Sequence, residues 1–211
     1  MDVRFWFDPL CPWCWITSFW IEEVARHRDV TVDWRPISLK VRNEPKDLDP
    51  AYAERHEPAM ERTFALLRVV EAMRAAGQAD RVRDVYVEFG RHFHHDDDGL
   101  TFDVADALAK AGVDDAFAAA YDDESWDEHV RRSTREAEAV AGDDVGTPII
   151  GFEVDGEWHG YFGPVIPSVP DTEQSLRLWD ALEAMVRVDG FYELKRTRTV
   201  GPDMSSVSLD R

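Results

Sequence analysis

Val3-Arg4-Phe5-Trp6-Phe7-Asp8-Pro9-Leu10-Cys11-Pro12-Trp13-Cys14 is the stretch that decides the fold. Its first five residues are almost all apolar, which is typical of a short strand buried on both faces of a parallel sheet. Asp8 and Pro9 end the strand, and Pro12 predicts the start of a helix because proline is favoured at the first helical position. Two cysteines spaced in this way at a helix start can form and reopen a disulfide, so the stretch indicates redox chemistry.

Cys11 and Cys14 are the only cysteines among the 211 residues. A disulfide between them would close a loop too short to restrain the unfolded chain much, and a reducing compartment disfavours structural disulfides. No apolar run approaches the roughly 20 residues of a membrane span, and the N-terminus shows no signal-peptide pattern. We therefore expect a cytoplasmic protein with no membrane partner, in which the cysteine pair is catalytic.

The net charge of −19 argues against nucleic acid or an anionic membrane surface as a partner, because both are polyanions. Positive charge is nevertheless concentrated in one short run near the C-terminus, at Lys195, Arg196 and Arg198. Two interpretations are open for this run. It forms salt bridges with the acidic body of the protein, or it recognises an anionic group.

The first half of the chain changes from a mixed to a helical pattern. Alternating apolar residues over 30–35 predict a second strand, so the first 40 residues form a strand-helix-strand unit. Helical periodicity then runs from about residue 58 to residue 142. Within it, Ser125 and Glu128 have the spacing of a capping box that opens a helix.

The second half returns to strands. Asp155-Gly156 is suited to a tight turn, which predicts a hairpin with strands over 149–154 and 157–162. Apolar residues at helical spacing predict a last helix over about 171–187. After Gly190 we expect a tail that frays.

This order of elements is that of an α/β protein with a thioredoxin fold carrying an inserted α-helical domain, as in DsbA-like proteins. The expected parts are a thioredoxin-fold domain (1–50 and 143–190), an inserted helical domain (51–142) and a C-terminal tail (191–211).

The chain resembles the DsbA-like branch of the thioredoxin superfamily in Cys11-Pro12-Trp13-Cys14 and in Val145-Gly146-Thr147-Pro148. It is similar in more detail to the actinobacterial mycothiol-dependent nitroreductases, which are cytosolic DsbA-like proteins. The matching segments cover residues 6–18, 144–148, 162–164 and 193–199. The helical insert, which shapes the substrate cleft in that family, matches less well.

The dithiol itself predicts a division of labour. Cys11 at the helix N-terminus has unpaired N–H groups and the helix dipole beside it, which favour a thiolate and make it the expected nucleophile. Cys14 lies one turn further on and can attack a mixed disulfide on Cys11, so it is the expected resolving cysteine. Pro12 and Trp13 lie between them, and the Trp13 ring either stacks a planar substrate or covers the site.

Other site residues are implied by the resemblance. Pro148 is expected to be cis and to face the dithiol, which exposes the backbone of Thr147 for hydrogen bonds to a substrate. Asn43 and Tyr52, in the loop expected before the insert, match polar positions of the family and are expected to contact substrate. His94 aligns with a residue that faces the cleft, where it would donate a proton.

Two further groups of polar residues are less specific. Asp8 is either a polar strand end or a group that relays a proton or raises the thiol pKa. The run from His92 to Asp98 is rich in metal-ligand types, but consecutive donors usually diverge, so we expect no metal site.

By resemblance, the expected function is a mycothiol-dependent reduction of nitroaromatic compounds or disulfides by a thiol-disulfide oxidoreductase. No tightly bound cofactor is expected, and the partners are a low-molecular-weight thiol and a small aromatic or disulfide substrate. Two alternatives stay open: a transferase or isomerase like glutathione transferase kappa, which activates a bound thiol without cycling a disulfide, and a redox-sensing binding protein or holdase. The sequence leaves the oligomeric state open.

Overall fold

The computed structural model describes residues 1–44 and 47–209. Residues 45–46, in the expected first segment, and residues 210–211, at the end of the expected tail, lie outside the described residues. The strands are β1 (Asp2–Phe7), β2 (Thr31–Pro36), β3 (Ile149–Val154) and β4 (Glu157–Phe162). The helices are α1 (Pro12–Ala25), α2 (Leu39–Asn43), α3 (Pro50–Ala75), α4 (Val82–His94), α5 (Val104–Lys110), α6 (Asp127–Ala141) and α7 (Thr172–Val186). Short 3-10 helices are η1 (Ala79–Arg81), η2 (Asp115–Asp122), η3 (Glu124–Trp126) and η4 (Met204–Ser206).

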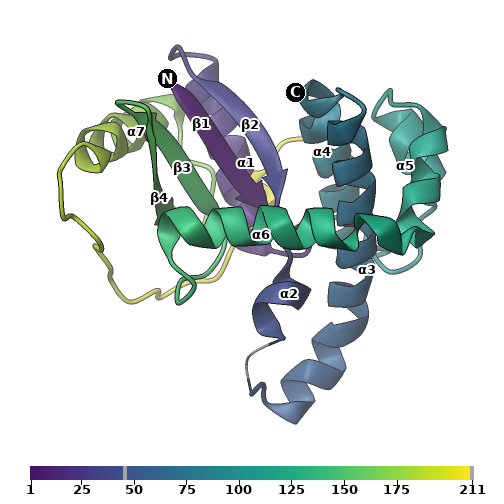
Figure 1. Ribbon diagram of the computed structural model, residues 1–211. Coiled ribbons are helices and arrows are strands. Elements are labelled where there is room, and N and C mark those ends of the chain that lie inside the picture. The colour runs from purple at the N-terminus through teal and green to yellow at the C-terminus, as the bar shows by residue number, and fades with distance from the viewer. Residues whose placement is uncertain (45–46, 210–211) are drawn as a thin grey trace.

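The four strands form one sheet in the order β2-β1-β3-β4, with α1 behind it and α6 across its front (Figure 1). β1 is parallel to β2 but antiparallel to β3, so the expectation of a parallel sheet is right on one side of β1 and wrong on the other. The helix α1 carries the chain back to the start of the sheet before β2, which makes that pair parallel. The chain enters β3 from the opposite end, after α6, and Ile149 therefore pairs with Trp6 at the end of β1.

β1 is buried on both faces, as the apolar sequence predicts. Val3, Phe5 and Phe7 belong to the main core, whereas Trp6 points to a second core on the side of α6, with Ile149. This follows from the two-residue period of a strand, which sends successive side chains to opposite faces. The fold is a thioredoxin fold with a helical insertion between β2 and β3.

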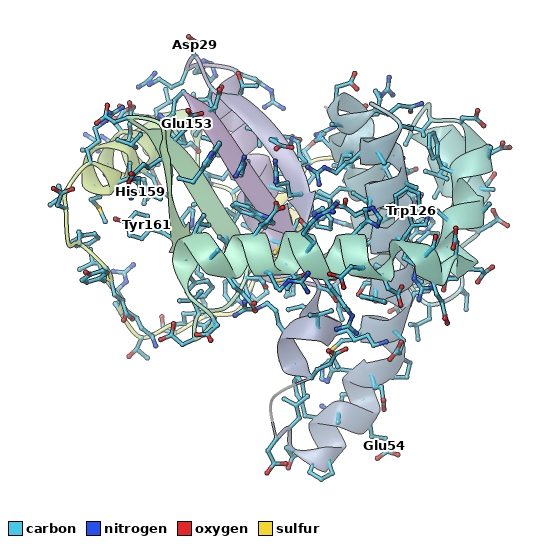
Figure 2. All side chains as sticks on the ribbon, in the orientation of Figure 1. Asp29, Glu54, Trp126, Glu153, His159 and Tyr161 are labelled. Atoms are coloured by element: carbon cyan, nitrogen blue, oxygen red, sulfur yellow. The ribbon has the colours of Figure 1, made fainter. Side chains whose placement is uncertain are left out.

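The insert begins earlier than its periodicity predicts. α3 starts at Pro50, because Asp49 caps it by accepting a hydrogen bond from Tyr52 N at 3.0 Å, and Pro58 lies inside the helix. Its first turns project away from the sheet, as the position of Glu54 in Figure 2 shows. None of the helices in the described ranges, including the 26-residue α3, is long and apolar enough to cross a membrane.

The capping box expected at Ser125 and Glu128 is wrong. α6 begins after Trp126, which makes no side-chain capping bond, and Asp123 caps the preceding η3 by accepting from Ser125 N at 3.0 Å. Asp123 thus takes the Ser125 N–H that a capping box would direct to Glu128, and the Glu128 carboxylate instead accepts from Arg135.

The C-terminal tail is exposed but attached at its far end. Asp203 N donates to Pro167 O at 2.6 Å, Val169 N donates to Ser206 Oγ at 3.1 Å, and Val207 is buried. The expectation that the whole tail frays is therefore wrong for this end, which packs on the main core through Met204.

Candidate active site at the dithiol

The sheet topology brings two distant segments to the same edge. Cys11 follows the end of β1, and Thr147-Pro148 precede the start of β3, which is antiparallel to β1. The Thr147-Pro148 peptide bond is cis, as expected, and so is the Gly163-Pro164 bond, which the sequence analysis did not anticipate. Thr147 is thereby placed directly against Cys11.

Cys11 is the N-cap residue of α1 and uses its sulfur as the capping group. Cys11 Sγ accepts a hydrogen bond from Cys14 N at 3.4 Å and from Thr147 Oγ1 at 3.1 Å. Burial opposes ionisation, but hydrogen bonds from the Cys14 thiol, the Thr147 hydroxyl and the Cys14 N–H together lower the pKa of Cys11 below its ordinary value. The geometry stabilises a thiolate at this position.

Cys14 has the opposite environment. It is fully buried, whereas Cys11 keeps an exposed fraction of 4%, so a partner from solvent meets Cys11 first. Burial raises the pKa of Cys14 well above its ordinary value, and its hydrogen bond to Cys11 adds to the effect. Both cysteines are free thiols here. The pair thus combines an acidic outer thiol with a protonated inner one.

Asp8 is a buried carboxyl group beneath the dithiol. Its two oxygens accept hydrogen bonds from Leu10 N at 2.9 Å and from Leu39 N at 2.8 Å. Burial raises the pKa of Asp8 to about 6, although these bonds and one from the Thr63 side chain act against the shift. Its charge also raises the pKa of both cysteines. Asp8 is therefore more than a polar strand end.

Trp13 is partly buried and packs against the main core. Arg198 from the C-terminal tail lies over its ring, with Cζ 5.3 Å from the ring centroid. One face of the ring is therefore already covered by a guanidinium group, so Trp13 both covers the site and offers a surface near it. Pro12, before it, occupies the first position of α1 as expected.

His94 stabilises the loop that leads to Cys11. Its Nε2 is 2.9 Å from Pro9 O, and its ring lies 5.4 Å from that of Trp15. Burial lowers the pKa of His94 to about 4. A neutral ring has one N–H, and the carbonyl of Pro9 requires it at Nε2. This geometry favours a positioning role over the expected proton donation.

Asn43 and Tyr52 do not lie in one loop. Asn43 ends α2 and donates to Met60 Sδ at 3.4 Å, whereas Tyr52 lies in the first turn of α3 and is 46% exposed. The Tyr52 ring stacks on His56 with centroids 4.1 Å apart. Among the contacts of the described residues, none joins Tyr52 to Cys11 or Cys14.

The run from His92 to Asp98 is partly divergent, as expected. His94 turns to Pro9, and His95 Nε2 accepts from Trp15 Nε1 at 3.1 Å. Potential ligand atoms of His92, Asp96 and Asp98 nevertheless converge within 4.8 Å. His92 Nδ1 is hydrogen-bonded to Asp98 at 2.7 Å, and Arg91 forms an ion pair with Asp96. The Arg91 guanidinium group thus already neutralises one of the two carboxylates in this cluster.

Three residues near the site escaped the sequence analysis: Thr63 beside Asp8, Tyr86 and Arg42. Burial raises the pKa of Tyr86 well above its ordinary value, and the charges of Cys14 and Cys11 add to the shift, which places its hydroxyl near both. Tyr86 continues the helical stripe of Val82 and Phe89, so periodicity could have marked it as inward-facing. Nothing in the sequence relates it to the dithiol.

Arg42 is a buried cation that supports the Thr147 loop. It donates to Glu138 Oε1 at 2.8 Å, to Asp143 O at 3.2 Å and to Val145 O. The guanidinium group therefore joins α2, the end of α6 and the segment that precedes Thr147. An arginine in a short polar helix normally suggests a solvent-exposed residue, so its role was not visible in the sequence.

Comparison with known proteins relates this site to a family. Residues 10–196 match the Rv2466c-like family, described as mycothiol-dependent nitroreductase Rv2466c. The uncharacterized protein Rv2286c of Mycobacterium tuberculosis is 31% identical over 209 residues, covering 93% of this chain and 82% of that protein.

Solved structures support the fold. The cytosolic disulfide reductase DsbM from Pseudomonas aeruginosa is similar with a TM-score of 0.55 and 14% identity, covering 87% of this chain and 99% of that chain. The probable DsbA oxidoreductase SCO1869 from Streptomyces coelicolor is similar with a TM-score of 0.55 and 19% identity, covering 94% of each chain. At these identities the likeness concerns the fold, a thioredoxin fold with an inserted helical region.

Proposed function

Because the chain belongs to the Rv2466c-like family of mycothiol-dependent nitroreductases, we propose that Cys11 and Cys14 cycle between dithiol and disulfide with mycothiol as the reductant. The chain is a thiol-dependent oxidoreductase of the DsbA type. The observation that carries the proposal is the difference between the two thiols, an acidic Cys11 held by Thr147 and a buried Cys14 with a raised pKa.

Cys11 is the nucleophile. Its thiolate attacks a sulfur atom of a bound disulfide, forms a mixed disulfide, and releases the other half as a thiolate. Cys14 then loses its proton and attacks Cys11 Sγ, which releases the second half and leaves the Cys11–Cys14 disulfide. Asp8, with a pKa of about 6 and buried beside the pair, is the group that accepts the Cys14 proton.

With a nitroaromatic acceptor the electron balance is the same. Oxidation of the two thiols to a disulfide yields two electrons and two protons, which convert a nitro group to a nitroso group and water. Two molecules of mycothiol then reduce the disulfide through a mixed disulfide on Cys11 and leave as mycothiol disulfide. No tightly bound cofactor takes part in this scheme.

The substrate lies between the dithiol and the cis-proline loop. Pro12, Trp13, Thr147 and Pro148 border the position of an incoming sulfur or nitro group, since they flank Cys11 in the chain or in space. His94 positions the Pro9 carbonyl and hence the loop before Cys11.

Asn43 and Tyr52 are the outer contacts, at α2 and the start of α3. A cytoplasmic location is part of the proposal, because it rests on the use of mycothiol. The proposed domain division assigns the dithiol to the thioredoxin-fold segments and these outer contacts to the junction with the insert.

Steady-state turnover tests the proposal. The reduced protein, supplied with mycothiol and a nitroaromatic or with mycothiol disulfide and an external reductant, is expected to turn over, and Cys11→Ser to lose at least 100-fold in rate. Arg177→Ala on α7 is a suitable surface control, since Arg177 and its partner Glu173 are both highly exposed. Turnover that survives Cys11→Ser overturns the mechanism.

Cys14→Ser separates this proposal from the chemistry of the kappa-class glutathione transferases. A cycling dithiol needs Cys14 to release the mixed disulfide, so the variant is expected to stall after one thiol has bound. Full activity without accumulation of a mixed disulfide would instead favour activation of a bound thiol by Cys11 alone.

A further inference from the structure

The cationic run of the tail forms no ion pair within the described residues. Lys195, Arg196 and Arg198 are all exposed, and of the two interpretations of this run, salt bridges with the acidic body are not found in the part of the chain that the structure describes. The remaining contact is that of Arg198 with the Trp13 ring, two residues from Cys11 in the chain. In a chain of net charge −19, this places an unpaired positive charge over the Trp13 ring, between the two cysteines in the chain.

The tail holds Arg198 in place through attachments on either side of it. Tyr161 of β4, labelled in Figure 2, donates its hydroxyl to Phe191 O at 3.1 Å. Beyond Arg198, Asp203 N donates to Pro167 O at 2.6 Å. The tail leaves α7, passes β4 and returns toward α1 (Figure 1). Arg198 therefore belongs to a tethered segment rather than to a free end.

We propose that Arg198, which lies over the Trp13 ring, is a specificity-determining residue that binds a carboxylate group of the molecule reacting at Cys11. Among the described residues the Arg198 guanidinium group makes no hydrogen bond or ion pair, and its paired N–H groups match the two oxygens of a carboxylate. Arg198 is exposed and Trp13 is half-buried, so a ligand can reach the guanidinium N–H groups without unfolding the tail. Without Arg198, the net negative charge of the protein and the carboxylate of Asp8 repel such a ligand.

A matched pair of alkylating reagents tests this charge selection directly. Iodoacetate carries a carboxylate and iodoacetamide does not, while both react by the same displacement: the Cys11 thiolate forms a bond to carbon and iodide leaves. The ratio of the two rates does not depend on the pKa of Cys11, because both reagents react with the same thiolate. The reaction is followed by mass spectrometry on the full chain carrying Cys14→Ser, so that Cys11 alone is titrated.

Arg198→Gln is expected to lower the iodoacetate to iodoacetamide ratio by about fivefold, the effect of one charge at several ångströms in a partly solvated site. Arg198→Lys keeps the charge and is expected to retain most of the ratio. Arg177→Gln removes the same charge from α7 and is expected to leave it unchanged. An unchanged ratio in Arg198→Gln, or an equal fall in Arg177→Gln, overturns the proposal.

Two further pairs identify which molecule carries the carboxylate. If the disulfide partner carries the carboxylate, Arg198→Gln is expected to lower the rate with 5,5′-dithiobis(2-nitrobenzoate) relative to the rate with neutral dithiodipyridine. It lowers the preference for 4-nitrobenzoate over 4-nitrobenzamide in turnover if the nitro acceptor carries it. An unaltered preference in both pairs overturns the assignment to a reacting ligand.

The proposal rests on the proposed function only in that Cys11 is the attacking thiol. If the protein did not turn over with mycothiol but Arg198→Gln still lowered the iodoacetate to iodoacetamide ratio, the proposed function would be wrong and the role of Arg198 would stand. If turnover were normal but Arg198→Gln left that ratio unchanged, the role of Arg198 would be wrong and the proposed function would stand.

Discussion

At the scale of single residues, the two thiols differ because they have opposite hydrogen-bond roles. Cys11 Sγ accepts from Thr147 Oγ1 and from Cys14 N, whereas Cys14 is a buried donor with a raised pKa. The spacing of the cysteines in the sequence predicts which one attacks. The contribution of Thr147 follows from an antiparallel pairing of β1 and β3 that the sequence analysis did not specify.

Thr147→Val is expected to raise the pKa of Cys11, because valine has nearly the same shape as threonine but lacks the hydroxyl that donates to Cys11 Sγ. Iodoacetamide alkylation below the wild-type pKa should slow by up to about tenfold. At a pH where Cys11 is fully ionised in both proteins the rates should be equal, which serves as the internal control. Equal rates at every pH would show that the hydroxyl does not stabilise the thiolate.

The raised pKa of Asp8 predicts that the stability of the fold decreases as the pH rises. Its pKa is about 6 in the folded protein against 3.8 for the free side chain, so between these values the folded state holds a proton that the unfolded state releases. This group therefore stabilises the fold at low pH and loses about 3 kcal/mol of stabilisation as the pH rises through 6.

Asp8→Asn removes that dependence. The free energy of unfolding of the variant minus that of the wild type should rise by about 2.4 kcal/mol between pH 4 and pH 7, as measured by urea denaturation. Taking the difference between the two proteins cancels the contribution of the other acidic groups to the pH dependence of stability. A difference that stays constant with pH would contradict a raised pKa at Asp8.

At the scale of elements, α1 and α4 can approach closely because α4 has a glycine at the contact. A Cβ atom at Gly90 would overlap the ring of Trp15, which is fully buried. Gly90→Ala is therefore expected to destabilise the protein by about 2 kcal/mol in urea denaturation, despite the better helix propensity of alanine. Gly201→Ala, with open space around its Cβ and a negative or extended φ, is the control and should be neutral. A neutral Gly90→Ala would contradict this packing.

Arg42 joins α2 and α6 to the loop before Thr147. Arg42→Ala leaves Glu138 without its partner and two carbonyls without donors, so a loss of about 3 kcal/mol in unfolding free energy is expected. Arg177→Ala, which removes an exposed ion pair, should change it by less than about 0.5 kcal/mol. Comparable losses in the two variants would show that burial of Arg42 contributes nothing.

The elements differ in how well the sequence predicts them. The strands 149–154 and 157–162 are found at their predicted positions, and the Asp155-Gly156 turn fixes the end of the first strand and the start of the second. The helical periodicity predicts α3 only from about residue 58, although Asp49 and Pro50 supply its cap and first turn and the expected insert begins at residue 51. Local signals identify an element more reliably than they identify its end.

At the scale of the whole molecule, the active site is assembled from segments far apart in the chain. The end of β1, the start of β3, α4 of the insert and the C-terminal tail all contribute residues near Cys11. Motifs predicted the first two, because the dithiol and the cis-proline have fixed places in a thioredoxin fold. The contributions of Arg42, Tyr86 and Arg198 depend on how the insert and the tail pack, which no local pattern specifies.

The central claim is that Cys11 forms the mixed disulfide and Cys14 resolves it, and trapping that intermediate tests it most directly. The Cys14→Ser protein is incubated with mycothiol disulfide and analysed by intact mass and peptide mapping, beside the wild type and Cys11→Ser. We predict one mycothiol on Cys11 in Cys14→Ser, a Cys11–Cys14 disulfide without bound thiol in the wild type, and no adduct in Cys11→Ser. A Cys14→Ser protein that carries no mycothiol, or a Cys11→Ser protein that carries it on Cys14, would contradict the claim.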